Sequence, residues 1–278
     1  AAGSYAQNRQ YQLPQSKTLV PRSNASNLKA VPVDRAKGDA FEVPFANPAT
    51  KNTVQANKVL PPTETLIGYT QYDLQTNSAI LNRFIKHSDG TMSAAWTMLC
   101  TGCPTGTDRG TGYNYFDGSA WGPIPATKIE PANRSGFPSI AVTTSGKEMS
   151  IAHSSTSGGM LLTWRPAKGT GAWTEYPNAL GNVSSDTWSK AIAGGANGES
   201  VHAIWNANAA ANGQNSTVYY SRSDDGGVTW PVLRTIIPNI DSTHYLGFGG
   251  DAYALDTKGD QIAMVTGDFT TDQILLKS

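Results

Sequence analysis

Two cysteines and four histidines are the residues with the clearest capacity for metal or redox chemistry. Cys100 and Cys103 form one Cys-Thr-Gly-Cys unit, and no second cysteine pair exists to complete the four ligands of a typical zinc site. The histidines share no metal-ligand spacing, so we predict no metal and no cofactor. A redox dithiol would need a strand-to-helix setting, and we interpret the pair as a small loop disulfide. The four histidines are His87, His153, His202 and His244.

Other catalytic motifs and strong charge are absent. The sequence has no nucleophile elbow and no phosphate-binding loop. Lys and Arg together number 21, as do Asp and Glu, which argues against a nucleic-acid binder. The first 60 residues are mildly basic and the remainder mildly acidic. No run of 18 apolar residues is present, so no membrane-spanning helix is predicted.

A local turn motif indicates how the chain is built. Residues 223–230 read Ser-Asp-Asp-Gly-Gly-Val-Thr-Trp and fit the pattern Ser-x-Asp-x-Gly-x-Thr-Trp. The Asp225 carboxylate can accept backbone N–H bonds, while Gly227 supplies backbone angles that other residues avoid. Trp230 can pack the turn onto its sheet. We predict a tight structural turn between two antiparallel strands, formed by Ser223, Asp225, Gly227, Thr229 and Trp230.

Internal repetition extends this local signal to the whole fold. A glycine turn followed by an apolar strand recurs at Gly90, Gly146, Gly198 and Gly259, with spacings of 56, 52 and 61 residues. Trp121, Trp173 and Trp230 form a second series with spacings of 52 and 57 residues. Short alternating or β-branched runs fill the intervals, without a helical period. A period near 50 with four strands per unit predicts an all-β fold, a β-propeller of four-stranded antiparallel blades.

The period also sets the predicted boundaries. Residues 1–62 read as an extended polar leader with little regular structure, and residues 63–278 as the propeller. Blade 1 covers about 66–130, with strands near 81–86, 91–98, 112–117 and 120–130; blade 2 covers about 131–180, blade 3 about 181–240, and a partial blade 4 about 241–278. About three complete blades suggest part of a longer propeller of six to eight blades. In the alternative, four blades close a ring and Leu66–Leu74 supplies the missing outer strand.

A family resemblance rests on residues 72–123. The run Tyr72-Asp-Leu-Gln-Thr-Asn77, the segment from Asp108 to Gly118 and Trp121-Gly-Pro123 resemble secreted Bacteroidota surface proteins. These are sialidase-like propellers of Asp-box (BNR) repeats that end in a type IX secretion sorting domain. The resemblance implies a secreted or cell-surface protein. The start at Ala1 agrees with removal of a signal peptide, although a trimmed chain would begin in the same way.

The resemblance to sialidases also implies candidate catalytic residues. Sialidases use arginines to clamp the sugar carboxylate, an Asp as acid/base and a Tyr activated by a Glu. Arg83 and Asp108 stand where that pattern puts its first arginine and its acid/base, and Arg134 could be a second clamp. Arg83-Phe84-Ile85 departs from the family's Arg-Ile-Pro, and no Tyr and Glu pair can be assigned. We therefore favour structural roles, with Arg83 ion-paired at a strand end and Asp108 in a solvated loop.

Propeller topology predicts further residues on the face that usually carries ligands, here called the mouth. Loops between blades and loops between second and third strands emerge together there. Aromatic side chains at a mouth suit stacking on sugars or anchoring a protein, although each could equally be a core residue. The turn residues 223–230 belong to the opposite face and are not site candidates. The ligand-binding candidates are Arg109, Asp186, Trp188, His244, Tyr245 and Asp268.

Three functions are compatible with these features. The first is a non-enzymatic secreted propeller that binds a glycan or a surface protein. The second is an exo-sialidase-type glycoside hydrolase completed by blades beyond Ser278. In the third, the protein is secretion cargo whose leader docks on a component of the secretion system. We favour the first, with no nucleic acid or membrane span involved.

Overall fold

The described part of the chain is built entirely from β-strands. The computed structural model describes residues 64–72, 74–76, 82–99, 108–181, 183–207, 209–268 and 273–277. The predicted leader, Cys100 and Cys103 lie outside these residues. The strands all belong to a compact unit that includes Leu66–Ser278. In chain order they are β1 (Phe84–Lys86), β2 (Met92–Met98), β3 (Gly110–Phe116), β4 (Gly136–Val142), β5 (Glu148–Ser154), β6 (Gly159–Arg165), β7 (Thr174–Tyr176), β8 (Asp186–Gly194), β9 (Ser200–Ala207), β10 (Val218–Ser223), β11 (Val232–Ile236), β12 (Phe248–Lys258), β13 (Gln261–Asp268) and β14 (Gln273–Lys277).

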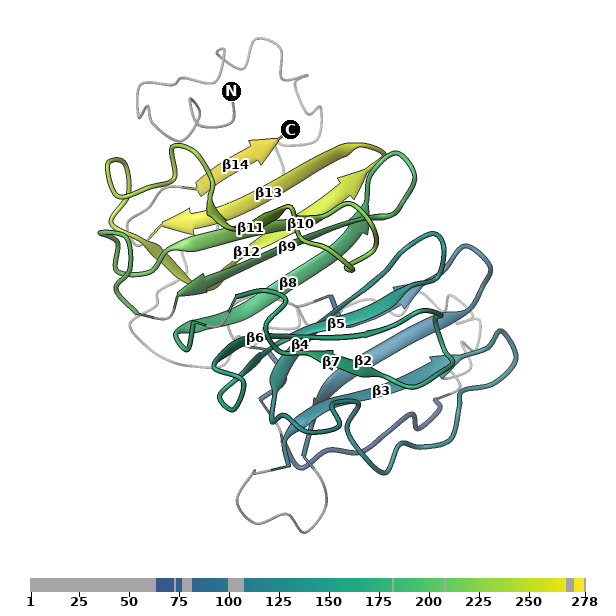
Figure 1. Ribbon diagram of the computed structural model, residues 1–278. Coiled ribbons are helices and arrows are strands. Elements are labelled where there is room, and N and C mark those ends of the chain that lie inside the picture. Colours follow the sequence, from purple (N-terminus) through teal and green to yellow (C-terminus); the bar gives the residue numbers. More distant parts are fainter. Residues whose placement is uncertain are drawn as a thin grey trace, which may run out of the picture. The chain divides into compact units, whose positions relative to one another are not determined.

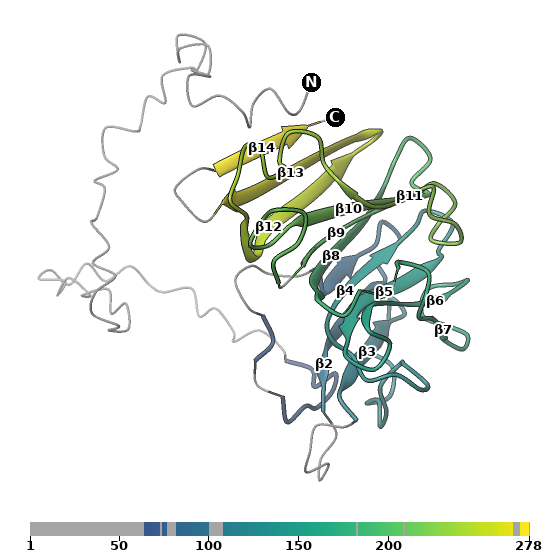
Figure 2. The ribbon, with the colours of Figure 1, turned by 60° about the vertical axis from the view of Figure 1, so that its left-hand side comes forward.

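These strands form four antiparallel sheets that follow the chain. The sheets are β1-β2-β3, β4-β5-β6-β7, β8-β9-β10-β11 and β12-β13-β14. Figures 1 and 2 show them side by side in sequence order, from blue to yellow. Contacts join β2 to β4, β4 to β8, and β8 to β12, so each sheet adjoins the next one in chain order. This is the blade arrangement of a β-propeller, and the predicted fold class is confirmed. No helix long and apolar enough to cross a membrane occurs in the described ranges.

The first sheet lacks the outer strand predicted at 120–130. Only an isolated bridge joins Phe116 to Trp121, and the Ile129 N–H donates to the Thr111 carbonyl at 2.9 Å. Proline has no N–H to donate to a ladder, and this short stretch contains Pro123 and Pro125. The strand prediction is therefore wrong here, and the segment crosses the blade edge as irregular chain.

The chain before β1 lies on this first sheet. The Gln71 N–H donates to the Leu99 carbonyl at 3.1 Å, and the Trp96 indole N–H donates to the Tyr69 carbonyl at 3.1 Å. Residues 66–72 thus pack along the sheet β1-β2-β3. The alternative in which Leu66–Leu74 supplies the outer strand beside β14 is wrong.

Apolar side chains fill the spaces between the later sheets. Ile151, Leu162 and Trp205 are each at most 1% exposed and belong to one cluster between the second and third sheets. Phe248 and Met264 belong to a second cluster between the third and fourth sheets. Burial of such side chains contributes about 1.5–3 kcal/mol each. Each sheet is therefore held by its neighbours as well as by its own ladder.

The turn between β10 and β11 has the predicted geometry. The Asp225 carboxylate accepts hydrogen bonds from the Val228 and Thr229 N–H groups at 3.1 and 2.9 Å, and from the Thr229 hydroxyl at 2.6 Å. Gly227 has a φ of 87°, in the left-handed region. The Gly226 N–H donates to the carbonyl of Glu199, in the β8–β9 turn, at 2.9 Å. The two turns occupy the same end of their sheet, opposite the loop between β9 and β10.

Candidate functional site

Two loops of the second sheet meet at the predicted mouth. Arg134 precedes β4, while Ser155 and Thr156 lie in the loop between β5 and β6. The Arg134 N–H donates to the Thr156 hydroxyl at 2.9 Å, and the Arg134 guanidinium donates to the Ser155 hydroxyl at 3.2 Å. The interblade loop and the loop between second and third strands are thus joined at one end of the sheet.

Bulges in two first strands hold aromatic rings at this end. Phe137 in β4 and Trp188 in β8 have φ values of 54° and 61°, and each lies at a register shift in its strand pair. A bulky residue in the left-handed region costs about 1–3 kcal/mol and persists only where its surroundings enforce it. The two rings meet edge to face with centroids 4.6 Å apart. The same distortion in successive blades brings both aromatics to one point.

His153 at the end of β5 completes the contact between these rings. Its ring stacks on Phe137 at 5.2 Å and meets Trp188 edge to face at 5.1 Å. Burial, together with the charges of Arg109 and Arg134, lowers the pKa of His153 to about 3. His153 is therefore neutral at ordinary pH, which lets Nδ1 accept a hydrogen bond from the backbone N–H of Trp188 at 3.4 Å.

Arg109 places a positive charge against this aromatic group. Its guanidinium carbon lies 5.1 Å from the Tyr72 ring centroid and 5.9 Å from that of Phe137. Nε donates to the Ser135 carbonyl at 2.9 Å, and Nη1 donates to the Tyr72 hydroxyl at 3.3 Å. Burial lowers the pKa of Arg109, and the nearby charge of Arg134 lowers it further. No carboxylate within the described ranges is ion-paired with it. We call Tyr72, Arg109, Phe137, His153 and Trp188 the mouth cluster.

Arg83 lies next to the mouth cluster. It immediately precedes β1, and its guanidinium donates to the Gln75 side-chain oxygen at 2.7 Å and to the Thr97 hydroxyl at 3.4 Å. The same hydroxyl accepts the Phe137 N–H at 3.1 Å. Arg83 is thus linked to the aromatic group through one side chain. The structure brings Arg83, Arg109 and Arg134 to the same end of the first two sheets, while their roles stay predictions.

Asp108 is placed less favourably for catalysis. Its side chain is 50% exposed, and one oxygen lies 3.6 Å from the Lys128 ammonium. A long ion pair with one exposed partner contributes about 0–1 kcal/mol. The contact with Lys128 agrees with the structural interpretation, and the acid/base role stays a prediction.

Asp186 is part of the framework behind the mouth. It is 1% exposed, accepts the Trp205 indole N–H at 2.7 Å, and binds the Arg234 guanidinium at 2.7 and 2.9 Å. The hydrogen bond to Asp186 raises the pKa of Arg234. The Asp186 carboxylate is thus buried with structural partners rather than displayed at the mouth.

The remaining candidates lie on or near the fourth sheet. His244 Nδ1 lies 3.0 Å from an Asp241 carboxylate oxygen in the turn before β12. Tyr245 is only 6% exposed and packs on Phe248 with ring centroids 5.7 Å apart. Asp268 ends β13, and its side chain lies outside the described part. None of these residues belongs to the mouth cluster.

Two members of the mouth cluster were missed by the sequence reasoning. Tyr72 was read only as part of the family motif, and Phe137 was not singled out. Phe137 and Trp188 stand 51 positions apart, close to the blade period. Aligning the first strands on that period would have paired the two aromatic residues.

The structure also contains a Tyr and Glu contact that sequence spacing could not assign. The Tyr113 hydroxyl donates to a Glu148 carboxylate oxygen at 2.7 Å, and Glu148 is fully buried. Burial raises the pKa of Tyr113, and the negative charge of Glu148 raises it further. Glu148 also binds the buried Arg165 guanidinium at 2.9 Å, so we interpret this contact as part of a structural ion-pair cluster. Within the described ranges, no three His, Cys, Asp or Glu residues gather as a metal-binding group.

Comparison with known proteins adds distant structural likenesses only. No protein-family model and no curated protein matches the sequence. A Dyadobacter fermentans protein of unknown function has 9% identity and a TM-score of 0.45, over 70% of this chain and 51% of that one. Trypanosoma rangeli sialidase has 14% identity and a TM-score of 0.44, over 72% of this chain and 37% of that one. The microbial sialidase Hz136 has 16% identity and a TM-score of 0.42, over 70% of this chain and 36% of that one. The aligned part is about half of the first structure and just over a third of the two sialidases.

Proposed function

We propose that this protein is a carbohydrate-binding β-propeller whose mouth cluster binds an acidic sugar without cleaving it. The observation that carries the proposal is Arg109. Its half-buried guanidinium lies over two rings and has no carboxylate partner in the described part of the chain. An arginine keeps its charge in a protein, so an anionic ligand group would complete its electrostatic environment.

The rest of the mouth cluster suits a sugar ring. Tyr72 and Trp188 are partly exposed, and an aromatic ring offers an apolar face with a polar edge. Arg109 can bind a carboxylate or sulfate through two parallel N–H donors. His153 and Phe137 support the exposed rings from behind, which limits the side-chain entropy lost on binding.

The direct test is binding of a panel of oligosaccharides, measured by isothermal titration calorimetry. We expect sialylated, uronate-containing or sulfated sugars to bind and neutral sugars of equal length to bind at least about tenfold more weakly. Arg109→Ala should weaken binding of the acidic ligand at least about tenfold. Arg222→Ala, which removes an arginine ion-paired with Asp224 at the other end of the third sheet, is the matched control. Equal binding by wild type and Arg109→Ala would contradict the proposal.

A glycoside hydrolase of sialidase type is the second candidate, because Arg83 and Arg134 lie beside the mouth cluster. Its acid/base would be Asp108, and blades beyond Ser278 would have to supply the nucleophile. Release of the fluorophore from a fluorogenic sialoside, lost in Arg83→Ala, would establish this activity. Binding of the sialoside without turnover would favour the non-enzymatic proposal.

We also propose that the protein acts outside the cell, as a type IX secretion cargo of the Bacteroidota kind. The Ser223–Trp230 turn has the hydrogen bonds expected of an Asp-box, and the mouth would meet a glycan or a surface protein. Fractionation of the producing bacterium tests the location. Recovery from the cell surface or medium is expected, and recovery only from the cytoplasm would contradict it.

A further inference from the structure

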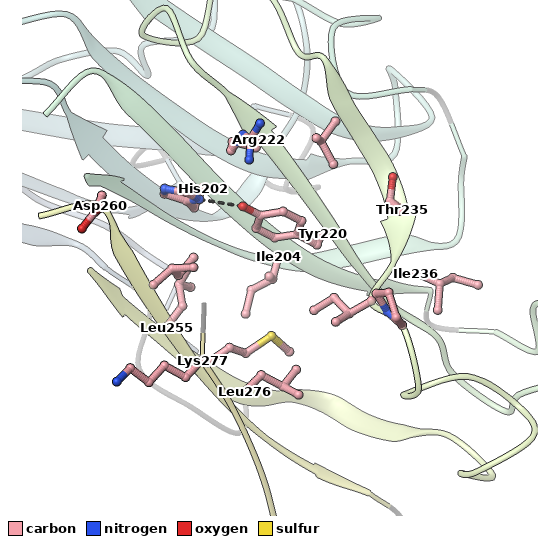
Figure 3. Close-up of a pocket in the computed structure, with 15 residues that line it drawn as sticks. His202, Ile204, Tyr220, Arg222, Thr235, Ile236, Leu255, Asp260, Leu276 and Lys277 are labelled. Atoms are coloured by element: carbon pink, nitrogen blue, oxygen red, sulfur yellow. Dashed lines mark hydrogen bonds between the residues drawn. The ribbon is translucent and has the colours of Figure 1, made fainter. Parts of the chain in front are cut away.

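Two cavities between neighbouring sheets differ in their linings. The cavity in Figure 3 lies between the third and fourth sheets and has a volume of about 410 Å³. Its wall is mostly aliphatic, and two of its polar residues, His202 and Tyr220, are hydrogen-bonded to each other at 2.7 Å. A second cavity, of about 360 Å³, lies between the first and second sheets and is lined by aromatic and polar residues. We call it the edge pocket, and the residues that carry its chemistry are Tyr113, Tyr115, Asp117, Trp121 and Arg165.

The edge pocket lies where the chain after β3 contacts that strand only at intervals. The Gly122 N–H donates to the Tyr115 carbonyl at 2.9 Å, and the next such bond, also 2.9 Å long, joins the Ile129 N–H to the Thr111 carbonyl. Backbone groups of alternate residues point to the same edge of a strand, so the Tyr113 N–H and carbonyl face outward too. Neither group has a hydrogen-bond partner in the described part of the chain. Tyr113 therefore offers one backbone donor and one backbone acceptor beside the pocket that it lines.

Two partly exposed aromatic side chains, Tyr115 and Trp121, line the edge pocket and are held in place. A Cβ on Gly169 would lie 2.3 Å from the Tyr115 ring, so only glycine lets the second sheet's loop approach that ring so closely. The Trp121 ring lies against Phe116 with centroids 5.7 Å apart. Among the described residues, neither the Tyr115 hydroxyl nor the Trp121 indole N–H has a hydrogen-bond partner. Each ring thus presents an apolar face with a polar edge, and its fixed position limits the entropy lost on binding.

The charges in the edge pocket leave a negative group without a counter-charge. Arg165 lines the pocket, but its charge is balanced by the Glu148 carboxylate, which accepts the Nε–H at 2.9 Å. One Asp117 oxygen accepts the Ser119 and Ala120 N–H groups at 2.8 and 2.9 Å, and the other oxygen has no partner in the described ranges. These backbone hydrogen bonds lower the pKa of Asp117, so it is charged at neutral pH. The pocket therefore favours a neutral ligand rich in hydroxyls over an acidic one.

We propose that the edge pocket is a second carbohydrate site of this protein, one that takes a neutral sugar residue. A sugar hydroxyl both donates and accepts hydrogen bonds, which matches the backbone donor and acceptor of Tyr113 and the second carboxylate oxygen of Asp117. The apolar C–H face of the sugar lies on the Trp121 ring. The volume is near the lower end of the range for ligand pockets, roughly 300–1,000 Å³, which suits one or two sugar residues. This site goes beyond the one proposed for the mouth cluster and does not depend on it.

The probes are the methyl glycosides of glucose, galactose, mannose and fucose, none of which carries a charge. Each is mixed at millimolar concentration with the 278-residue protein, and binding is measured by saturation-transfer difference NMR. We expect at least one glycoside to bind saturably. Trp121→Ala should weaken that binding at least about tenfold, because the sugar loses its stacking face. Tyr176→Ala is the matched control, because Tyr176 is a 43% exposed aromatic residue on β7 that does not line the edge pocket.

A conservative variant keeps the test decisive even if Trp121→Ala fails to fold. Asp117→Asn retains an oxygen that can accept the Ser119 and Ala120 N–H groups, so the turn should keep its shape. The change removes the charged acceptor and should weaken binding of the glycoside about fivefold. Equal binding of the glycoside by the wild type and Asp117→Asn would overturn the proposal.

A cross-check against the mouth cluster separates the two sites. Arg109→Ala should leave binding of the neutral glycoside unchanged, and Trp121→Ala should leave binding of an acidic sugar unchanged. Absence of binding by all four glycosides, or equal binding by the wild type and Trp121→Ala, would overturn the proposal. Binding of the glycoside that is lost in Arg109→Ala and kept in Trp121→Ala would also overturn it, because the neutral sugar would then lie at the mouth cluster.

Discussion

Two arginines in the described part of the chain lie over pairs of aromatic rings, and their surroundings differ. Arg165 at the end of β6 lies 4.2 Å from the Trp173 ring centroid and 4.6 Å from that of Tyr113. It is 5% exposed and binds the buried Glu148 carboxylate at 2.9 and 2.5 Å. Arg109 lies 5.1 and 5.9 Å from its two rings, is more exposed, and has carbonyl and hydroxyl partners in place of a carboxylate.

The difference separates framework from recognition. A buried arginine with a carboxylate already has its counter-charge, and any ligand would have to displace that partner. A partly exposed arginine supported by aromatic rings can bind an anion without first breaking an ion pair. Residue type alone therefore does not distinguish the two clusters, since both contain arginine, tyrosine and tryptophan. The two clusters are distinguished by the exposure of the arginine and by the presence of a carboxylate partner.

The largest expected effect is on folding stability, and it comes from the pair formed by Glu148 and Arg165. Glu148→Gln removes the negative charge and leaves the buried guanidinium uncompensated. We expect a loss of about 3–5 kcal/mol in the free energy of unfolding. Urea denaturation at pH 7 measures this loss of stability. The folded fraction of the variant should keep its affinity for an acidic sugar. A loss below about 1 kcal/mol would mean that Glu148 and Arg165 are not a framework pair.

The mouth cluster should show a smaller effect that depends on pH. Because the folded pKa of His153, about 3, lies below its unfolded value of 6.5, the unfolded chain binds a proton first as the pH falls. Stability from this group is present above pH 6.5 and declines toward pH 3. We expect the wild type to lose about 1–3 kcal/mol more than His153→Phe between pH 7 and pH 4, after allowance for partial exposure. Equal losses of stability in the wild type and in His153→Phe would contradict a lowered pKa of His153.

The repeating features of the fold could be predicted from the sequence, and the pairings across sheets could not. Glycine turns and the Asp225 motif act locally, so their spacing gives the blade period. The partnership of Asp186 with Arg234 joins residues 48 positions apart, and Glu148 reaches Tyr113 over 35 positions. Phe137 reaches the mouth through a bulge, which shifts strand register in a way that alternation alone does not reveal.

The smallest expected change in stability belongs to Arg109→Ala. The substitution removes a guanidinium from the Tyr72 and Phe137 rings, together with its hydrogen bonds to the Ser135 carbonyl and the Tyr72 hydroxyl, but it leaves no buried carboxylate without a partner. We expect a loss of about 1 kcal/mol or less in urea denaturation. The conservative variant Arg109→Lys keeps the charge without the planar donor pair, so it should retain stability and regain only part of the anion affinity. A loss as large as that of Glu148→Gln would make Arg109 a framework residue, and the distinction between the two clusters would fail.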